Sequence, residues 1–243
     1  MRRLLTFKDK LLENIKFKWF AKYEPTIAAV IERVHNDHLT YIDKIALVDL
    51  AKIVIENEEK SINGAIVETG CALGGSALLI AKAKKRNRPL AIYDVFGMIP
   101  PPSKKDGQDI HERYKKILVG KSQGIDGDIY YGYENDLLNK VKRSFHAYDL
   151  EPKRNSIIFI RGLYQDTVNI DHQISLAHID CDWYESTMVC LERIAPHIVP
   201  GGTIVIDDYY HWSGCRTAVG EYFKGKKQYE LRHRSRLHVI KKR

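Results

Sequence analysis

The chain has 243 residues, of which 44% are hydrophobic and 29% are charged, a composition typical of a globular protein and not of a disordered chain or a coiled coil. This length suits one large domain or one domain with an added cap, and it can bury a full core without disulfide or metal crosslinks. The sequence contains no apolar run of about 18 residues, so we expect no transmembrane helix.

The formal net charge of +8 is concentrated at the two ends of the chain. Residues 1–22 carry seven basic and two acidic side chains, and residues 221–243 carry nine and two, so the central part is net negative. A nucleic-acid enzyme usually gathers its positive charge on one face or along a groove. The distribution therefore disfavours nucleic-acid binding, and a binding protein that uses only its basic ends is kept as an alternative.

The start of the sequence and its cysteines indicate a cytoplasmic protein. Arg2 and Arg3 are typical of a signal-peptide n-region, but charged residues interrupt the apolar stretch that would have to follow. The four cysteines form no C-x-x-C pair, so they predict neither a zinc site nor a redox motif. We expect reduced, mostly buried thiols.

Residues 1–60 are predicted to form an N-terminal helical segment. Apolar positions among lysines predict an amphipathic helix over residues 4–20, and further helices are predicted over 25–34 and 42–56. The basic first helix suits contact with a neighbouring subunit or with an anionic membrane surface, and we favour the subunit contact.

From residue 61 onwards, short apolar strands alternate with helices. Strands are predicted at 65–68, 90–95, 156–160, 174–179 and 203–206, helices at 76–85, 186–195 and near 216–224, and a closing pair of strands at 228–233 and 235–240. Such alternation is typical of βαβ units and predicts an α/β fold with a mostly parallel sheet covered on both faces. Open sheets of this kind bind ligands at the carboxyl ends of their strands.

One long segment interrupts this alternation. Residues 97–155 contain a triple-proline run and no clear strand, and a loop of this length in a compact domain is usually functional or partly helical. We therefore predict a cap over the site, with helices at 109–118 and 134–143, inserted into a domain that spans residues 61–243.

A glycine-containing loop, VETGCALGGS at residues 67–76, follows the first predicted strand and opens a helix. Glycines allow a ligand to approach the backbone closely, and the helix start offers free N–H groups. The loop departs from the G-x-G-x-x-G dinucleotide motif. Asp94 ends the next strand and is placed to accept hydrogen bonds from both hydroxyls of a ribose, and Glu68 offers a carboxylate to an ammonium group. A ribose and an amine without a required pyrophosphate site fit S-adenosylmethionine.

Four aspartates follow two neighbouring predicted strands, Asp180 and Asp182 after one and Asp207 and Asp208 after the next. Their carboxylates would repel one another unless a cation or protons intervene. Mg²⁺ prefers hard oxygen ligands and keeps positions open for substrate. We assign Asp180, Asp207 and Asp208 as ligands of Mg²⁺ or another divalent cation. Asp182 is assigned as the general base for a metal-polarised substrate hydroxyl.

These motifs resemble the macrocin O-methyltransferase family, a group of metal-dependent sugar O-methyltransferases of macrolide and aminocoumarin biosynthesis. The segment IDCDWYESTMVCLERIAPHIVPGGTIVIDDYYHWSGCRTAV is similar to the family's signature region, and VETGCALGGSALLI is similar to its cofactor loop. YDVFGMIPPP and IRGLYQDTV resemble its second-strand motif and the segment after its third strand. The motifs occur in order and at compatible spacing over roughly residues 40–225.

The resemblance implies a class I S-adenosylmethionine-dependent methyltransferase fold, Rossmann-like with a mostly parallel seven-stranded sheet. It implies a divalent ion, usually Mg²⁺, that holds two vicinal sugar hydroxyls, and it places the four aspartates on the family's metal and base positions. Contacts with the cofactor are implied for Glu68, Gly70, Gly74, Gly75, Ser76, Asp94, Gly162 and Asp166. Such enzymes form dimers or tetramers in which N-terminal helices contribute to the neighbour's site, so we expect a homo-oligomer.

Two further side chains follow the aspartates. His211 and Trp212 are predicted to form a wall of the acceptor pocket, because aromatic rings stack on sugar faces, and a packed ring beside a surface histidine is the alternative. His178, on the strand before Asp180, is interpreted as a hydrogen-bonded core residue. Cys181 stands where the family often has glycine.

The sequence thus predicts an enzyme that transfers a methyl group from S-adenosylmethionine to a hydroxyl of a sugar, in a glycosylated natural product or a saccharide. A metal-dependent methyltransferase of catechol-like phenols is the main alternative. A non-catalytic cofactor-binding subunit is disfavoured, because a scaffold has no need of an aspartate cluster.

Overall fold

The computed structural model describes residues 7–243, with side chains from Leu12 onwards. The predicted start of the first helix at residues 4–6 lies outside the described residues. Over the described part of the chain, no helix has the length and apolar character needed to cross a membrane.

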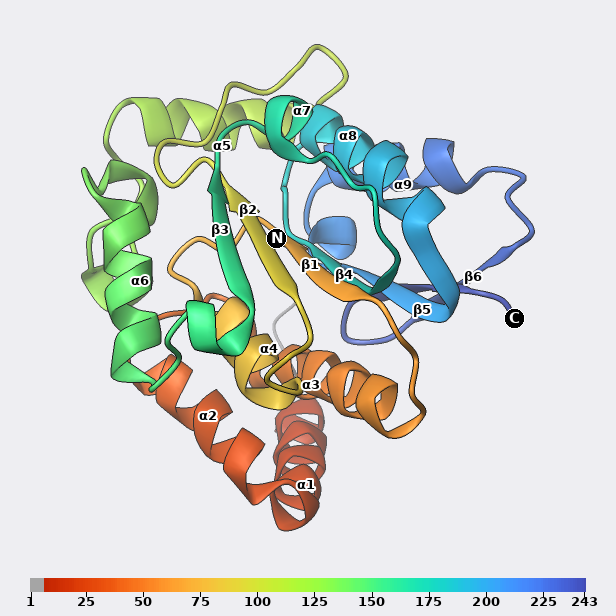
Figure 1. The fold of residues 1–243 in the computed structure, drawn as a ribbon. Helices are drawn as coiled ribbons and strands as arrows, with labels where there is room; N and C mark the ends of the chain where they lie inside the picture. Colours follow the sequence, from red (N-terminus) through yellow and green to blue (C-terminus); the bar gives the residue numbers. More distant parts are fainter. Residues whose placement is uncertain (1–6) are drawn as a thin grey trace.

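A seven-stranded sheet runs through the centre of the molecule in the order β3-β2-β1-β4-β5-β7-β6 (Figure 1). Its strands are β1 (Ala65–Thr69), β2 (Leu90–Asp94), β3 (Ile157–Arg161), β4 (Ile174–Ile179), β5 (Ile198–Ile206), β6 (Tyr229–His233) and β7 (Leu237–Lys241). The first five strands are parallel, and β7 pairs antiparallel with both β5 and β6. Every predicted strand is confirmed, but β5 begins earlier than predicted, because Ile198 already pairs with Ile174 before a register shift.

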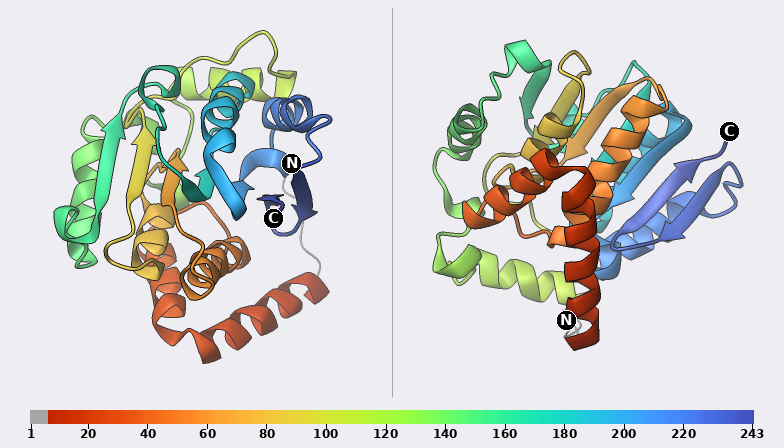
Figure 2. Two further views of the ribbon diagram at one scale, coloured as in Figure 1. Left: turned by 45° about the vertical axis from the view of Figure 1, so that its right-hand side comes forward. Right: turned by 90° about the horizontal axis from the view of Figure 1, so that it is seen from below.

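Helices cover both faces of the sheet (Figures 1 and 2). One face carries α2 (Pro25–Asn36), α3 (Lys44–Glu59), α4 (Gly75–Ala83) and α6 (Leu137–Ala147), and the other carries α7 (Tyr164–Thr167), α8 (Tyr184–Ile194) and α9 (Ser213–Phe223). Outside these layers, α1 (Phe7–Tyr23) packs against α2 and α3, and α5 (Gln108–Leu118) contacts α9. Short 3₁₀ turns occur at Ile125–Gly127, Tyr131–Tyr133, Lys153–Asn155, Ala195–His197 and Asp208–Tyr210. The single turn α7 was not predicted.

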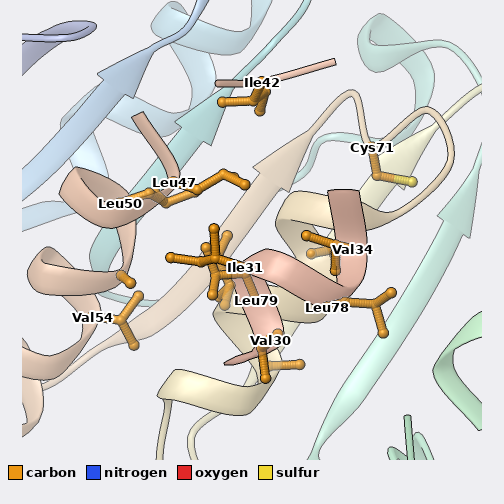
Figure 3. Packing of buried hydrophobic residues seen from close by; sticks show 14 of the residues in the cluster. Val30, Ile31, Val34, Ile42, Leu47, Leu50, Val54, Cys71, Leu78 and Leu79 are labelled. Atoms are coloured by element: carbon orange, nitrogen blue, oxygen red, sulfur yellow. The ribbon is translucent and has the colours of Figure 1, made fainter. Parts of the chain in front are cut away.

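Apolar side chains at helical spacing join α2, α3 and α4 into one core (Figure 3). Ile31 and Val34 of α2 pack with Leu47 and Leu50 of α3 and with Leu79 of α4, and all of them are buried. Burying one such side chain contributes about 1.5–3 kcal/mol. This core therefore fixes α4, and with it the glycine loop that leads into the helix.

The segment predicted as a cap divides into two parts. α6 buries Val141 and Phe145 in the core of the first face, so it serves as the crossover helix between β2 and β3. We confine the cap to the part before α6. Asp106 of the cap accepts a hydrogen bond from the N–H of Tyr184 at the start of α8 (2.7 Å), and Asp109 accepts one from the N–H of Ser213 at the start of α9 (3.1 Å). These carboxylates use free N–H groups at helix N-termini to anchor the cap.

Candidate active site

The carboxyl ends of the parallel strands border one open cavity of about 2600 Å³. Pockets for a single small ligand typically measure about 300–1,000 Å³, so this cavity has room for a cofactor and an acceptor. Its wall includes all four predicted aspartates and both predicted wall residues: Asp180, Asp182, Asp207, Asp208, His211 and Trp212. The fold thus brings together the residues that were predicted from two separate strand ends.

The glycine loop is held by Asp94. One oxygen of this carboxylate accepts hydrogen bonds from the N–H groups of Cys71 (2.8 Å) and Ala72 (3.2 Å), and the other accepts one from Phe96 (2.7 Å). A carboxylate has about four lone-pair sites. Three of them are used by the backbone, so Asp94 first shapes the loop and keeps one site for a ligand.

The predicted cofactor residues fall into two groups. Gly70 and Asp94 line the cavity. The others do not line it: Glu68, Gly74, Gly75 and Ser76 are buried, Gly162 is half-buried and Asp166 is exposed. Between the last two of these, residues 163–165 line the cavity and were not named from the sequence, although the motif after the third strand pointed to their segment. The role of each residue toward S-adenosylmethionine stays a prediction.

A buried chain of polar groups runs behind the aspartates. His178 Nδ1 lies 2.8 Å from a carboxylate oxygen of Glu68, and His178 Nε2 lies 3.9 Å from Asp207. Arg236, on the turn between β6 and β7, donates to Asp207 (2.7 Å) and to Asp43 (3.0 Å). The interpretation of His178 as a hydrogen-bonded core residue is confirmed, since it is 1% exposed. Arg236 was missed, because nothing separates it from the other basic residues near the C-terminus.

The pKa values of this chain follow from its charges. Burial opposes the charged form of His178, but Asp207 and Glu68 raise its pKa to about 9. Burial also favours the neutral form of Asp207, but His178 and Arg236 outweigh this effect and lower its pKa. Asp207 is thus held as a carboxylate. The second oxygen of Glu68 is buried and has no hydrogen-bond partner among the described residues.

The other three aspartates are crowded against one another. Burial and then the neighbouring carboxylates raise the pKa of Asp180 well above its usual range, and burial and Asp207 raise that of Asp208 to about 6. Burial and the charge of Asp208 raise the pKa of Asp182 in the same way. Its φ of +59° is an unusual backbone conformation, and its N–H donates to Asp208 (3.0 Å). Such strain is found at functional sites, and added positive charge would relieve the crowding.

Possible ligand atoms group slightly differently from the prediction. Atoms of Asp207, Asp208 and His211 lie within 4.8 Å of one another. Asp180 lies close enough to this group that Asp207 and Asp208 contribute to raising its pKa, after burial. His211, predicted as a wall residue, therefore also lies where it can hold a cation. Trp212 partly opposes the rise in the pKa of Asp182.

Residues 35–232 match the model of the macrocin O-methyltransferases. The chain belongs to this family. It is 28% identical over 169 residues to demethyldecarbamoylnovobiocin O-methyltransferase of Streptomyces niveus, a match that covers 67% of this chain and 59% of that one. It is also 28% identical over 167 residues to 8-demethyl-8-(2,3-dimethoxy-alpha-L-rhamnosyl)-tetracenomycin-C 4'-O-methyltransferase of Streptomyces olivaceus, covering 66% and 58%. The matched region thus spans less than two thirds of these curated relatives.

The solved structures agree with this assignment. The structure of the O-methyltransferase NovP superposes with a TM-score of 0.71 at 22% identity, covering 95% of this chain and all of that one. The fold is therefore that of the class I S-adenosylmethionine-dependent methyltransferases, as the resemblance to the macrocin O-methyltransferase family implied.

Proposed function

We propose that this macrocin O-methyltransferase family member transfers the methyl group of S-adenosylmethionine to a sugar hydroxyl, with a divalent cation held in the aspartate cluster. The observation that carries the proposal is the crowding of Asp180, Asp182 and Asp208 in the same cavity as the glycine loop. Family membership supports methyl transfer. The name of the Streptomyces olivaceus relative includes a rhamnosyl group, which supports a sugar acceptor.

The donor set fits a hard divalent cation such as Mg²⁺. Asp180, Asp207 and Asp208 would hold it through carboxylate oxygens, and His211 is a further candidate ligand. When bound, the cation would lower the pKa of the acceptor hydroxyl. Arg236 and His178 keep Asp207 charged and fixed in position, which prepares one ligand in advance.

Asp182 is the proposed general base. The acceptor hydroxyl gives its proton to the Asp182 carboxylate while its oxygen forms a bond to the methyl carbon. The bond between that carbon and sulfur breaks, its electron pair stays on sulfur, and S-adenosylhomocysteine is released. The hydrogen bond from the N–H of Asp182 to Asp208 fixes the backbone at the proposed base, and holding both substrates in one cavity removes much of the entropic barrier.

Labelled methyl transfer tests this proposal. We expect the protein to move a labelled methyl group from S-adenosylmethionine to members of a glycoside panel and not to catechols. EDTA should abolish the transfer, because the acceptor hydroxyl is then not acidified, and excess Mg²⁺ should restore it. Full activity in EDTA would refute the cation, and transfer to catechols alone would favour the phenol-type alternative.

We also propose that α1 mediates self-association. Four of its large side chains are more than half exposed: Leu12 at 56%, Ile15 at 54%, Trp19 at 57% and Tyr23 at 59%. Their spacing places them on one stripe of the helix. α1 lies outside the two helix layers, and a stripe of exposed apolar side chains on such a helix suits an interface between copies of this chain.

Replacing Leu12, Ile15 and Trp19 by serine is expected to shift the protein to the monomer in analytical ultracentrifugation. Replacing Lys18 and Lys22 by serine is the control, since it changes the charge of the same helix and leaves the stripe intact. If the stripe variant stays associated but loses binding to anionic liposomes, the helix contacts a membrane instead.

A further inference from the structure

One arginine of the cap lines the cavity without a polar partner. Arg113 lies on α5 and is partly buried. Among the described residues, its guanidinium makes neither a hydrogen bond nor an ion pair with any carboxylate, and it lies over the ring of Tyr130, 5.3 Å from the ring centroid. Arg236 also lines the cavity, but its guanidinium donates hydrogen bonds to both Asp207 and Asp43. The charge of Arg113 is therefore available to a ligand.

Arg113 lines the same cavity as the proposed base Asp182. Burial and the charge of Asp208 raise the pKa of Asp182, and the positive charge of Arg113 partly opposes this, although no ion pair joins the two residues among the described part of the chain. The ring of Tyr130, over which Arg113 lies, is held by its neighbours. Tyr130 is 3% exposed and packs on the rings of Tyr131 (4.4 Å between centroids) and Tyr133 (5.1 Å). A preorganised guanidinium loses less entropy when it binds a partner.

Among the described residues, no carboxylate of the cavity forms an ion pair with Arg113. Asp207 is already paired with Arg236 (2.7 Å) and lies near His178, and the remaining aspartates are the proposed cation ligands and base. A guanidinium presents a planar fork of donors that matches a carboxylate or a phosphate in a bidentate manner.

We infer that Arg113 binds an anionic group of the acceptor, a carboxylate or a phosphate carried on or next to the methylated sugar. This inference rests on the proposed function and narrows its acceptor from sugars in general to acidic ones. A uronic acid and a sugar phosphate share this chemistry, and separate probes distinguish them.

Binding measurements with three probes test the inference. Methyl glucuronoside carries a carboxylate, glucose 1-phosphate carries a phosphate, and methyl glucoside is neutral. In the presence of S-adenosylhomocysteine and Mg²⁺, we expect at least one anionic probe to bind the wild type about tenfold or more tightly than the neutral probe in titration calorimetry. Arg113→Gln should remove this preference, and Arg113→Lys should keep part of it. Lys116→Gln is the matched control, because it removes one charge from an exposed position of the same helix.

Four outcomes would overturn the inference. The anionic and neutral probes bind the wild type equally, or no probe binds at millimolar concentration. Lys116→Gln lowers the preference as much as Arg113→Gln does, which would indicate a general charge effect. Arg113→Gln weakens the binding of S-adenosylhomocysteine more than the binding of the anionic probes, which would assign the guanidinium to the cofactor. A wild type that fails to bind S-adenosylhomocysteine would instead refute the proposed function.

Discussion

Replacing Asp182 by asparagine is expected to lower the rate of methyl transfer by about 10²- to 10⁴-fold. Asparagine has the same size and keeps the backbone N–H that donates to Asp208 (3.0 Å), so the loop should retain its shape. The amide oxygen, however, accepts no proton from a hydroxyl at neutral pH. The loss should therefore appear in the rate of a single turnover, measured with labelled S-adenosylmethionine at saturating acceptor.

Binding measurements separate a lost base from a damaged site. The variant should bind S-adenosylhomocysteine and Mg²⁺ as the wild type does in titration calorimetry. Burial and neighbouring carboxylates raise the pKa of Asp182, and a base works only when deprotonated, so the wild-type rate should fall as the pH drops. The part of this acid limb that Asp182 contributes should vanish in the variant, whereas protonation of the proposed cation ligand Asp208, whose pKa is raised to about 6, should still lower the rate. Glu185→Gln, at an exposed carboxylate that also lines the cavity, is the control and should keep both rate and pH profile. A variant of Asp182 with near-wild-type turnover would exclude this residue as the base.

The sheet and its helices were predictable because their hydrophobic periodicity is local. The predicted strand at 174–179 matches β4, and the helix at 109–118 matches α5 almost residue for residue. The errors arose where local signals conflict. Pro200 and the two glycines after it read as a turn, although β5 continues through them. The pattern of α6 is the same for a cap helix and for a crossover helix, and only the burial of Phe145 in the core separates the two.

The aspartate cluster was predictable for a topological reason. β4 and β5 are neighbours, with Ile179 beside Ile206, so the residues after them meet. Arg236 and Asp43 reach the same place from the C-terminal hairpin and from the start of α3, where Asp43 also caps the helix through the N–H of Ala46. Such contacts depend on tertiary packing between distant segments. No spacing in the sequence encodes them, and the same holds for Arg113 of the cap.

Gly70→Ala is expected to lower the free energy of unfolding by about 3 kcal/mol, through steric overlap and an unfavourable backbone conformation together. A Cβ at this position would lie 1.9 Å from the carbonyl oxygen of Asp180, and φ is +86°. Neither side can move away easily. The N–H of Gly70 donates to Tyr93 (2.8 Å), and the N–H of Asp180 donates to Thr69 (2.9 Å). Urea denaturation of the purified protein measures the loss.

Gly225→Ala isolates the contribution of the backbone conformation, because its φ of +75° is similar and a Cβ there meets nothing within 4 Å. We expect it to cost about 1 kcal/mol and to leave ligand binding unchanged. Because Gly70 packs directly on the backbone of Asp180, the Gly70 variant should weaken the binding of both S-adenosylhomocysteine and Mg²⁺. This one close contact would then couple the glycine loop to the cation site. Equal losses of stability in the two variants would contradict this close approach. Loss of S-adenosylhomocysteine binding with unchanged Mg²⁺ binding would show that the two sites respond independently.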